Sequence, residues 1–278
     1  DFEEYLYYKT RLLNMCRIGL VNKDDEHAPQ IIKAANCELY TYSEESKEAD
    51  FVASDIRYVS QPDFVGTEFH ISGKYDMEVR LGIPGLFNVV NALAAVSVCS
   101  FLGLDQARIS HALENIRVNG RMEIVYTSER CTVLVDYAHN AVSMESLLST
   151  LRDYKPKRLV CVFGCGGNRS KDRRYSMGEI GGKMADLSII TADNSRYEKV
   201  EDIIADIRGS IEKTGGKFIE IPDRREAIRY SILHAQPGDM VAVIGKGHED
   251  YQEINGVRHH FLDREVIEET VKELGEKA

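Results

Sequence analysis

A glycine-rich segment with several cations, residues 164–174, is the part of this sequence most suited to binding an anion. It contains Gly164, Gly166 and Gly167, and four cations follow them: Arg169, Lys171, Arg173 and Arg174. Glycines between a strand and a helix let the backbone approach a ligand closely and aim N–H groups at it. An apolar run at 159–163 predicts the strand, and helical periodicity from about 174 to 185 predicts the helix. The pattern indicates an anion-binding turn.

Two further predicted strands also end in polar, charged and glycine residues. The run at 187–191 is followed by Asp193-Asn194-Ser195-Arg196, and the run at 240–244 by Gly245-Lys246-Gly247-His248-Glu249. The carboxyl ends of parallel strands lie at one edge of a sheet, where ligands of α/β proteins bind. We therefore expect the three strand ends to form one binding site.

Two other interpretations of the glycine turn stay open from the residues alone. The turn could be purely structural, since such turns are common after strands. It could also belong to the dinucleotide fingerprint of a nicotinamide-dependent oxidoreductase. That pattern fits poorly, because Arg169 stands in place of the third glycine and Asp193 lies beyond the usual spacing of about 20 residues.

Four smaller groups carry polar side chains at suggestive positions. Asn91 stands near the start of a predicted helix, where an amide suits either an adenine edge or a helix cap. Arg121 lies at a predicted domain junction, and Asp136 and His139 follow a predicted strand. Lys9 precedes two acids, Asp24 and Asp25, but alone it is typical of a solvent-exposed helical lysine.

The elements that must position these residues change character near residue 117. Before it we expect helices at 1–14, 27–35, 88–102 and 105–114, with strands near 17–22, 38–42, 51–59, 64–72 and 75–81. After a linker at 117–123, strands near 123–127, 132–136, 159–163, 187–191, 217–221 and 240–244 alternate with helices near 141–153, 174–185, 197–213, 223–235 and 263–276. Such alternation predicts an α/β fold with a mostly parallel sheet. Asn255-Gly256 predicts a hairpin.

Composition excludes some classes of protein. The 278 residues are 43% apolar and 29% charged, as in ordinary globular proteins, and the net charge of −10 argues against a nucleic-acid partner. The six cysteines show no C-x-x-C pair, so we expect reduced core residues in a cytoplasmic protein. No apolar run is long enough for a membrane span, and no signal peptide opens the chain. The start at Asp1, without Met, suggests a fragment.

Taken together and in order, these motifs resemble the Mur ligases, and most closely the MurE-type members that add diaminopimelate. The elements that carry the resemblance are Tyr8-Lys9-Thr10-Arg11-Leu12, Asn88-Val89-Val90-Asn91-Ala92-Leu93-Ala94-Ala95, Gly120-Arg121-Met122-Glu123, Val135-Asp136-Tyr137-Ala138-His139, Phe163-Gly164-Cys165-Gly166-Gly167-Asn168-Arg169, Asp193-Asn194-Ser195-Arg196 and Gly245-Lys246-Gly247-His248-Glu249. They span nearly the whole chain.

The resemblance implies that residues 1–116 are the latter part of a central ATP-binding domain. It implies that residues 117–278 are a Rossmann-like C-terminal domain that binds the amino acid. The family's UDP-binding domain and P-loop have no counterpart here: the four Gly-Lys pairs are followed by Tyr75, Met184, Phe218 and Gly247. We therefore expect this chain alone to be inactive.

The implied reaction is ATP-dependent addition of meso-diaminopimelate to UDP-MurNAc-L-Ala-D-Glu, through an acyl phosphate, with ATP and Mg²⁺ as cofactors. By resemblance, Lys9 is carbamylated and supports Mg²⁺, while ATP meets Asn91, Arg121, Asp136 and His139. The implied diaminopimelate contacts are Arg169, Asp193, Asn194, Ser195, Arg196, Gly245 and Glu249.

One departure bears on the amino acid that is added. The family motif has proline where Ser195 stands, and proline stiffens that turn. An L-lysine-adding ligase therefore remains an alternative, as does a non-catalytic module that binds nucleotide or amino acid. In each case the expected partners are small molecules, with no nucleic acid and no membrane, and the protein is expected to be a cytoplasmic monomer.

Overall fold

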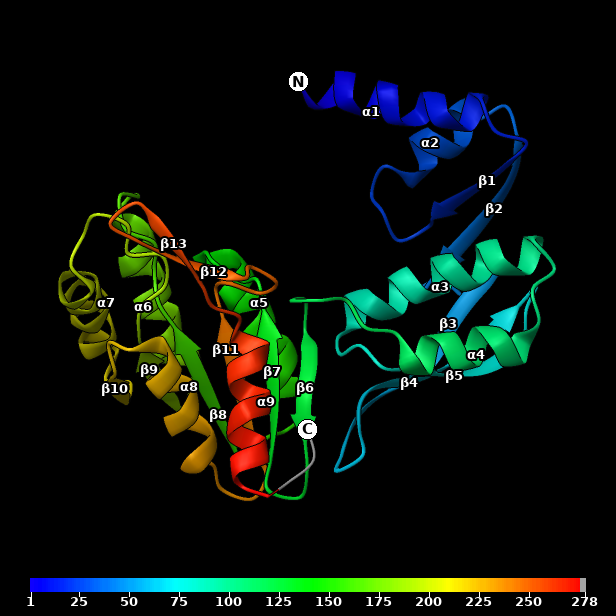
Figure 1. Cartoon of the computed structure of the whole chain (residues 1–278). Coiled ribbons are helices and arrows are strands. Elements are labelled where there is room, and N and C mark those ends of the chain that lie inside the picture. Colours follow the sequence, from blue (N-terminus) through cyan, green and yellow to red (C-terminus); the bar gives the residue numbers. More distant parts are fainter. Residues whose placement is uncertain (276–278) are drawn as a thin grey trace. The chain divides into compact units, whose positions relative to one another are not determined.

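The computed structural model describes residues 1–275 and divides into two units (Figure 1). The first unit comprises residues 1–59 and 66–116, and the second comprises 60–65 and the chain from 117 onwards. Each unit has its own sheet and its own core. The mostly parallel α/β fold that the sequence predicts is confirmed.

The first unit is built on a five-stranded sheet. Its strands run in the order β1 (Ile18–Asn22), β2 (Glu38–Ser43), β3 (Phe51–Gln61), β4 (Phe64–Gly73) and β5 (Met77–Leu81). β1, β2 and β3 pair in parallel, whereas β4 and β5 are antiparallel. Helices α3 (Leu86–Phe101) and α4 (Gln106–Asn115) supply Leu93 and Ile109 to a core that includes Phe51 and Phe69.

A smaller cluster lies at the N-terminal part of this unit. It joins the 3₁₀ turn Leu12–Asn14, β1 and α2 (Ala28–Ala34) through Leu13, Val21 and Ala28. The predicted helix 1–14 is therefore α1 (Phe2–Arg11) followed by that turn. Its apolar face is mostly exposed, since Phe2, Tyr5 and Leu12 keep more than half of their surface in solvent.

The second unit is built on a six-stranded sheet in the order β10-β9-β8-β11-β7-β6. Its strands are β6 (Glu123–Thr127), β7 (Cys131–Asp136), β8 (Arg158–Phe163), β9 (Leu187–Ile190), β10 (Phe218–Glu220) and β11 (Asp239–Ile244). All pair in parallel except β6, which runs antiparallel to β7. β8 and β11 are neighbours, and β9 flanks β8, so their carboxyl ends lie side by side at one edge.

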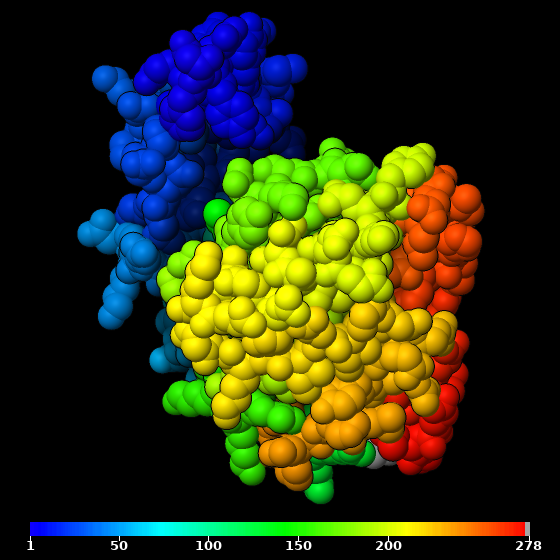
Figure 2. All heavy atoms as spheres, turned by 90° about the vertical axis from the view of Figure 1, so that its left-hand side faces the viewer, coloured from blue at the N-terminus to red at the C-terminus, as the bar shows by residue number. Residues whose placement is uncertain are grey.

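Helices cover both faces of this sheet, which explains the unbroken apolar runs of its strands. One face meets α8 (Arg224–Leu233) and α9 (Asp263–Glu273), with Ile228 and Val266 in the core. α5 (Ala141–Asp153), α6 (Asp172–Met184) and α7 (Val200–Thr214) pack against one another on the other face. α7, drawn in yellow, covers much of the face that Figure 2 shows.

Among the helices of the second unit, the largest differences from the predicted bounds are at the start of α7 and the end of α9. α7 begins at Val200 rather than near 197, because Arg196 takes the left-handed φ of 50° and pairs with the hairpin instead. α9 ends at Glu273, while the last residue of the predicted helix, Glu276, lies outside the described residues. The hairpin predicted at Asn255-Gly256 is confirmed as β12 (Tyr251–Ile254) and β13 (Val257–His260).

No helix within residues 1–275 is long and apolar enough to cross a membrane.

Candidate functional site

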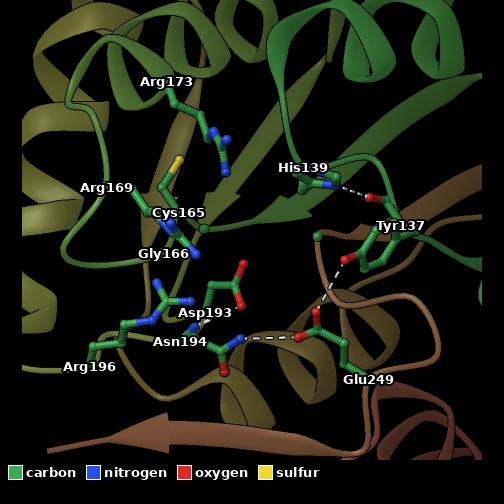
Figure 3. A pocket seen from close by; sticks show the side chains of 12 residues that line it. Tyr137, His139, Cys165, Gly166, Arg169, Arg173, Asp193, Asn194, Arg196 and Glu249 are labelled. Atoms are coloured by element: carbon green, nitrogen blue, oxygen red, sulfur yellow. Dashed lines mark hydrogen bonds between the residues drawn. The ribbon is translucent and has the colours of Figure 1, made fainter. Parts of the chain in front are cut away.

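A cavity of about 360 Å³ opens at the carboxyl edge of the second unit's sheet (Figure 3). It lies where the segments after β7, β8, β9 and β11 meet. Its lining residues are Tyr137, His139, Gly164, Cys165, Gly166, Arg169, Arg173, Asp193, Asn194, Arg196, Gly245 and Glu249. The three predicted strand ends thus line one cavity.

The glycine turn after β8 packs tightly against the segment after β9. A Cβ on Gly164 would overlap the carbonyl oxygen of Thr191, and one on Gly167 would overlap that of Ser195. The Gly167 amide also donates to the Asn194 carbonyl over 2.9 Å. Any side chain at these glycines would push the two cavity walls apart.

A buried arginine supports this turn from below. Arg174 is 1% exposed and lies 2.8 Å from Glu198 and 2.9 Å from Asp206. The Glu198 carboxylate accepts from the backbone amide of Asn168, which has a φ of 53°. The hydrogen bond from Arg174 and that amide lower the pKa of Glu198.

One wall of the cavity is acidic. The Asn194 amide nitrogen donates to Glu249 Oε2 over 3.1 Å, and the Tyr137 hydroxyl donates to Glu249 Oε1 over 3.3 Å (Figure 3). The carboxylate of Asp193 points into the same space. Gly245 has a φ of 112°, and a Cβ there would lie 3.2 Å from Asp193 Oδ2. Two carboxylates on one wall suit a ligand with an ammonium group.

The opposite side of the cavity carries three guanidinium groups, those of Arg169, Arg173 and Arg196 (Figure 3). Arg196 donates to the Gly167 carbonyl over 2.7 Å and pairs with Glu253 over 3.3 Å. Within residues 1–275, neither Arg169 nor Arg173 forms an ion pair. These two cations are therefore available to a carboxylate or phosphate of a ligand.

A second polar group surrounds Tyr137. Asp136 is buried and accepts from the amides of Met122 over 2.8 Å and Ala138 over 2.7 Å. Burial raises its pKa, although these hydrogen bonds and Arg121 act in the opposite direction. The Arg121 guanidinium lies 4.9 Å from the centre of the Tyr137 ring. The centre of the His139 ring lies 4.8 Å from the centre of the Tyr137 ring. Arg121, Asp136 and His139 therefore lie close together around Tyr137.

The other two predicted residues belong to the first unit. Lys9 is an exposed residue of α1 whose ammonium lies 5.3 Å from the centre of the Tyr5 ring. Asn91 lies on the exposed side of α3. Asp24, one of the two acids that come later in the sequence than Lys9, accepts hydrogen bonds from the Ser43 hydroxyl and the Glu44 backbone amide.

The described residues do not by themselves complete a magnesium site. No three His, Cys, Asp or Glu side chains within residues 1–275 are grouped so that they could hold a metal ion. Carbamylated Lys9 would add one anionic oxygen, and Mg²⁺ needs about six oxygen ligands.

The cysteine in the cavity is not suited to nucleophilic chemistry. Burial raises the pKa of Cys165 to about 12, so its thiol is protonated at neutral pH. All six cysteines are free. The chemistry of the cavity therefore depends on its charged and amide groups.

The structure adds Tyr137, Arg173, Lys246 and Arg224 to the residues predicted for the site. The first three belong to motifs already singled out, but only Arg173 was given a general role there, as one cation of the anion-binding turn. Arg224 has no such signal, because it stands at the start of α8, far along the chain from the motifs. Ser195, by contrast, is buried beside the turn and does not line the cavity.

Arg224 joins two of the strand ends. It has almost no exposed surface and pairs with Asp263 through two contacts of 2.7 Å. It also donates to the Ala192 carbonyl over 3.2 Å, just after β9, and to the Ile244 carbonyl over 3.0 Å, at the end of β11. Asp193 and Gly245 follow directly, so Arg224 fixes the positions from which both enter the cavity.

Two family models match most of the chain. The Mur ligase middle domain matches residues 1–99, and the Mur ligase glutamate ligase domain matches residues 120–247. The second match includes the cavity's glycine turn and the segment after β9.

The chain belongs to the Mur ligase family.

Several curated relatives match over nearly the whole chain. A UDP-N-acetylmuramoyl-L-alanyl-D-glutamate–2,6-diaminopimelate ligase of Caldanaerobacter subterraneus is 37% identical over 98% of this chain and 56% of its own length. A ligase of the same name from Clostridium acetobutylicum is 40% identical over 96% of this chain and 55% of its own length. The chain thus spans about half the length of the curated Mur ligases it matches.

Solved Mur ligases show the same fold. A structure of UDP-N-acetylmuramoyl-L-alanyl-D-glutamate–2,6-diaminopimelate ligase is 34% identical, with a TM-score of 0.79, and covers 100% of this chain and 58% of its own. The UDP-N-acetylmuramate–alanine ligase of Thermotoga maritima is 18% identical, with a TM-score of 0.65 over 99% of this chain and 55% of its own. The second likeness speaks to the fold alone.

Proposed function

We propose that this chain is part of an ATP-dependent, amide-forming ligase of peptidoglycan precursor synthesis, which adds meso-diaminopimelate to UDP-MurNAc-L-Ala-D-Glu. The observation that carries the proposal is the polarity of the cavity. Asp193 and Glu249 lie on one wall and Arg169, Arg173 and Arg196 on the other. A zwitterionic amino-acid end, with an ammonium beside a carboxylate, matches that arrangement.

The arginines favour diaminopimelate over L-lysine. After one amine of diaminopimelate has formed the amide, its distal end still carries an ammonium and a carboxylate, whereas the side chain of lysine ends in an ammonium alone. Arginine holds a carboxylate through two parallel hydrogen bonds, and a lysine ligand would bring no carboxylate to Arg169 and Arg173, the two cavity cations that form no ion pair within residues 1–275. An uncompensated charge in a partly closed site lowers affinity. Serine at position 195 leaves this argument intact, because Arg196 is held by its hydrogen bond to the Gly167 carbonyl and its ion pair with Glu253.

The polar residues around Tyr137, at the carboxyl end of β7, support the binding of ATP beside the amino-acid cavity. We assign Asp136 to the ribose, and Arg121 and His139 to the phosphates or the ribose of ATP. Asn91 is assigned to the adenine, and carbamylated Lys9 to the support of Mg²⁺, both by resemblance to the family. Mg²⁺ would offset repulsion between the phosphates and the substrate carboxylate. In the reaction that we propose, the D-glutamyl carboxylate attacks the γ-phosphate of ATP and ADP leaves. The amine of the amino acid then attacks the acyl carbon, loses a proton and displaces phosphate to form the amide.

The 278-residue chain by itself is proposed to be inactive. Phosphate binding in P-loop enzymes needs a glycine-rich loop with a Lys followed by Ser or Thr, and no Gly-Lys pair of this sequence has that neighbour. We place the protein in the cytoplasm as a monomer that acts on small molecules. Its free cysteines support a reducing compartment, and its net charge of −10 argues against a nucleic-acid partner.

The proposal is tested by the product that the full-length protein forms. The protein is incubated with UDP-MurNAc-L-Ala-D-Glu, ATP, Mg²⁺ and meso-diaminopimelate, and the nucleotide product is analysed by mass spectrometry. We expect a tripeptide product and one phosphate released for each amide formed. Failure to extend the dipeptide with any diamino acid, by a folded protein, would refute the proposed function.

A further inference from the structure

Lys246 is a buried cation directly beneath the acidic wall of the cavity. Its side chain has no exposed surface, and it does not line the cavity. The ammonium nitrogen lies 3.3 Å from Asn194 Oδ1, 3.5 Å from Glu249 Oε2 and 3.9 Å from Asp193 Oδ1. One buried lysine therefore contacts three residues of the proposed amino-acid site.

The hydrogen bonds of Lys246 determine how Asn194 is oriented. A lysine ammonium can only donate, so it must meet the oxygen of the Asn194 amide and not its nitrogen. The Glu253 backbone amide donates to the same oxygen over 2.9 Å. With the oxygen held from two sides, the amide nitrogen faces Glu249 and donates to Oε2 over 3.1 Å. The placement of the Glu249 carboxylate thus depends on Lys246 directly and through Asn194.

Lys246 also sets the charge of this wall. The nearby Arg224 and Asp263 pair with each other and cancel. Lys246 then faces two carboxylates, Asp193 and Glu249, so the group retains one negative charge. Burial lowers the pKa of Lys246, while Asp193 and Glu249 act to keep it charged. One negative charge matches one ligand ammonium.

We propose that Lys246 is a positioning residue that orients Asn194 and Glu249 and offsets one of the two carboxylate charges. The wall then accepts a ligand end with a single ammonium beside a carboxylate. This inference rests on the proposed function. Without Lys246 the wall carries two uncompensated negative charges, which favour a lone ammonium over a zwitterion. L-lysine should then gain relative to meso-diaminopimelate.

The test compares Lys246→Met and Lys246→Gln with the wild type in the full-length protein. We expect KM for meso-diaminopimelate to rise about tenfold or more, because a buried charge pair loses one partner. KM for ATP should change by less than about twofold. The kcat/KM ratio of meso-diaminopimelate to L-lysine should fall about tenfold in both variants. Glutamine keeps a hydrogen-bond donor for the Asn194 side chain, so KM for meso-diaminopimelate should rise less in Lys246→Gln than in Lys246→Met.

Lys183→Met is the matched control, since Lys183 is an exposed lysine of α6 that pairs with Glu179. It should leave every constant unchanged. If both Lys246 variants keep the wild-type ratio of the two amino acids, Lys246 does not set the charge of the site, and the proposal is overturned.

A crystal structure tests the positioning role of Lys246 without measuring enzyme activity, and so separates it from the proposed function. In crystal structures of Lys246→Met, the Asn194–Glu249 contact should be lost or the carboxylate turned, whichever amino acid the wild type adds. An unchanged contact would overturn the positioning role. If Lys246→Met does not fold, Lys246→Met combined with Glu249→Gln restores the charge balance and should fold. Failure of both variants to fold would show that Lys246 acts through packing and contradict the proposal.

Discussion

The two units differ in how firmly they hold the residues predicted to function. In the second unit, Asp193 and Asn194 are buried, and Asn194 and Glu249 are hydrogen-bonded to each other. In the first unit, Lys9 and Asn91 are exposed residues on helices. The amino-acid cavity is thus built and oriented within one unit. The residues assigned to ATP and Mg²⁺ in the first unit are single groups that need further partners.

This difference shows that a binding site depends on the buried residues that hold its backbone in place as much as on the side chains that face the ligand. Arg224 joins the ends of β9 and β11, and Arg174 supports the glycine turn after β8. Both arginines are buried, and neither lines the cavity. The predictions that follow test these supports and the ligand groups in turn.

The largest expected effect concerns the buried support of the second unit. Arg224→Met leaves Asp263 as a buried charge without its partner, which destabilises a protein by about 3–5 kcal/mol. We expect a loss of that size in the free energy of opening of β9 and β11, measured by amide hydrogen exchange. Arg229→Met, which removes the solvent-screened pairs of Arg229 with Glu273 and Glu226 on the same side of the sheet, should lower it far less. Equal losses would show that Arg224 is no special support.

The next largest effect tests the basic side of the cavity. Arg196→Ala removes the cation assigned to the distal carboxylate, so kcat/KM for meso-diaminopimelate in the full-length protein should fall about 100-fold or more. KM for ATP should stay close to the wild-type value. Arg208→Ala, an arginine on α7 that pairs with Glu220, is the control and should behave as wild type. A similar loss of ATP affinity would contradict the assignment of Arg196 to the amino-acid site.

Lys9→Ala tests whether the exposed first-unit residue becomes functional in the full-length protein. Losing a group that supports a metal should lower kcat about 30- to 100-fold. Short carboxylic acids should restore part of the rate, because they replace the anionic oxygen of the carbamate. Lys33→Ala, an exposed lysine on α2, serves as control. Full activity of Lys9→Ala would remove Lys9 from the site.

The smallest effect is the acid sensitivity of the glycine turn. The pKa of Glu198 is lowered by Arg174 and the Asn168 amide, and hydrogen bonds from Arg174 and Lys171 contribute to lowering that of Asp206. Groups with lowered folded-state pKa values stabilise the fold above their unfolded pKa near 4, and that stability is lost as the pH falls through the folded value.

Glu198→Gln removes one of these acids, so its unfolding free energy should fall less steeply below about pH 5 than that of the wild type. Solvent screening keeps the difference below about 1 kcal/mol. Glu201→Gln, an exposed glutamate at the start of α7, should retain the wild-type slope. Identical slopes for Glu198→Gln and the wild type would contradict the support assigned to Glu198.

Much of the fold could be predicted from the sequence because its signals are local. Apolar runs and their spacing predicted the strands of the second unit, and Asn255-Gly256 predicted the hairpin. The start of α7 could not be predicted, because Arg196 takes its left-handed conformation through pairing with Glu253 and Asn255 in the distant hairpin. Backbone hydrogen bonds between segments distant in the sequence overrode the local helical signal there.

The candidate site was predictable to the extent that its residues follow strands in recognisable motifs. Arg169, Asn194 and Glu249 line one cavity because β8, β9 and β11 end at the same edge of the sheet. Arg224 could not be found in this way, since its role depends on backbone carbonyls rather than on a motif. Ser195 shows the converse, because a motif position can lie behind the cavity wall rather than in it.

The central claim is that the cavity of the second unit takes a zwitterionic amino-acid end, and competition between two substrates tests it most directly. The full-length protein is given UDP-MurNAc-L-Ala-D-Glu and ATP with meso-diaminopimelate and L-lysine at equal concentrations, and the two tripeptide products are counted by mass spectrometry. The polarity of the cavity predicts that the diaminopimelate product dominates by about 100-fold or more, since lysine lacks the carboxylate that the cavity arginines would bind. A preference for L-lysine would contradict the account.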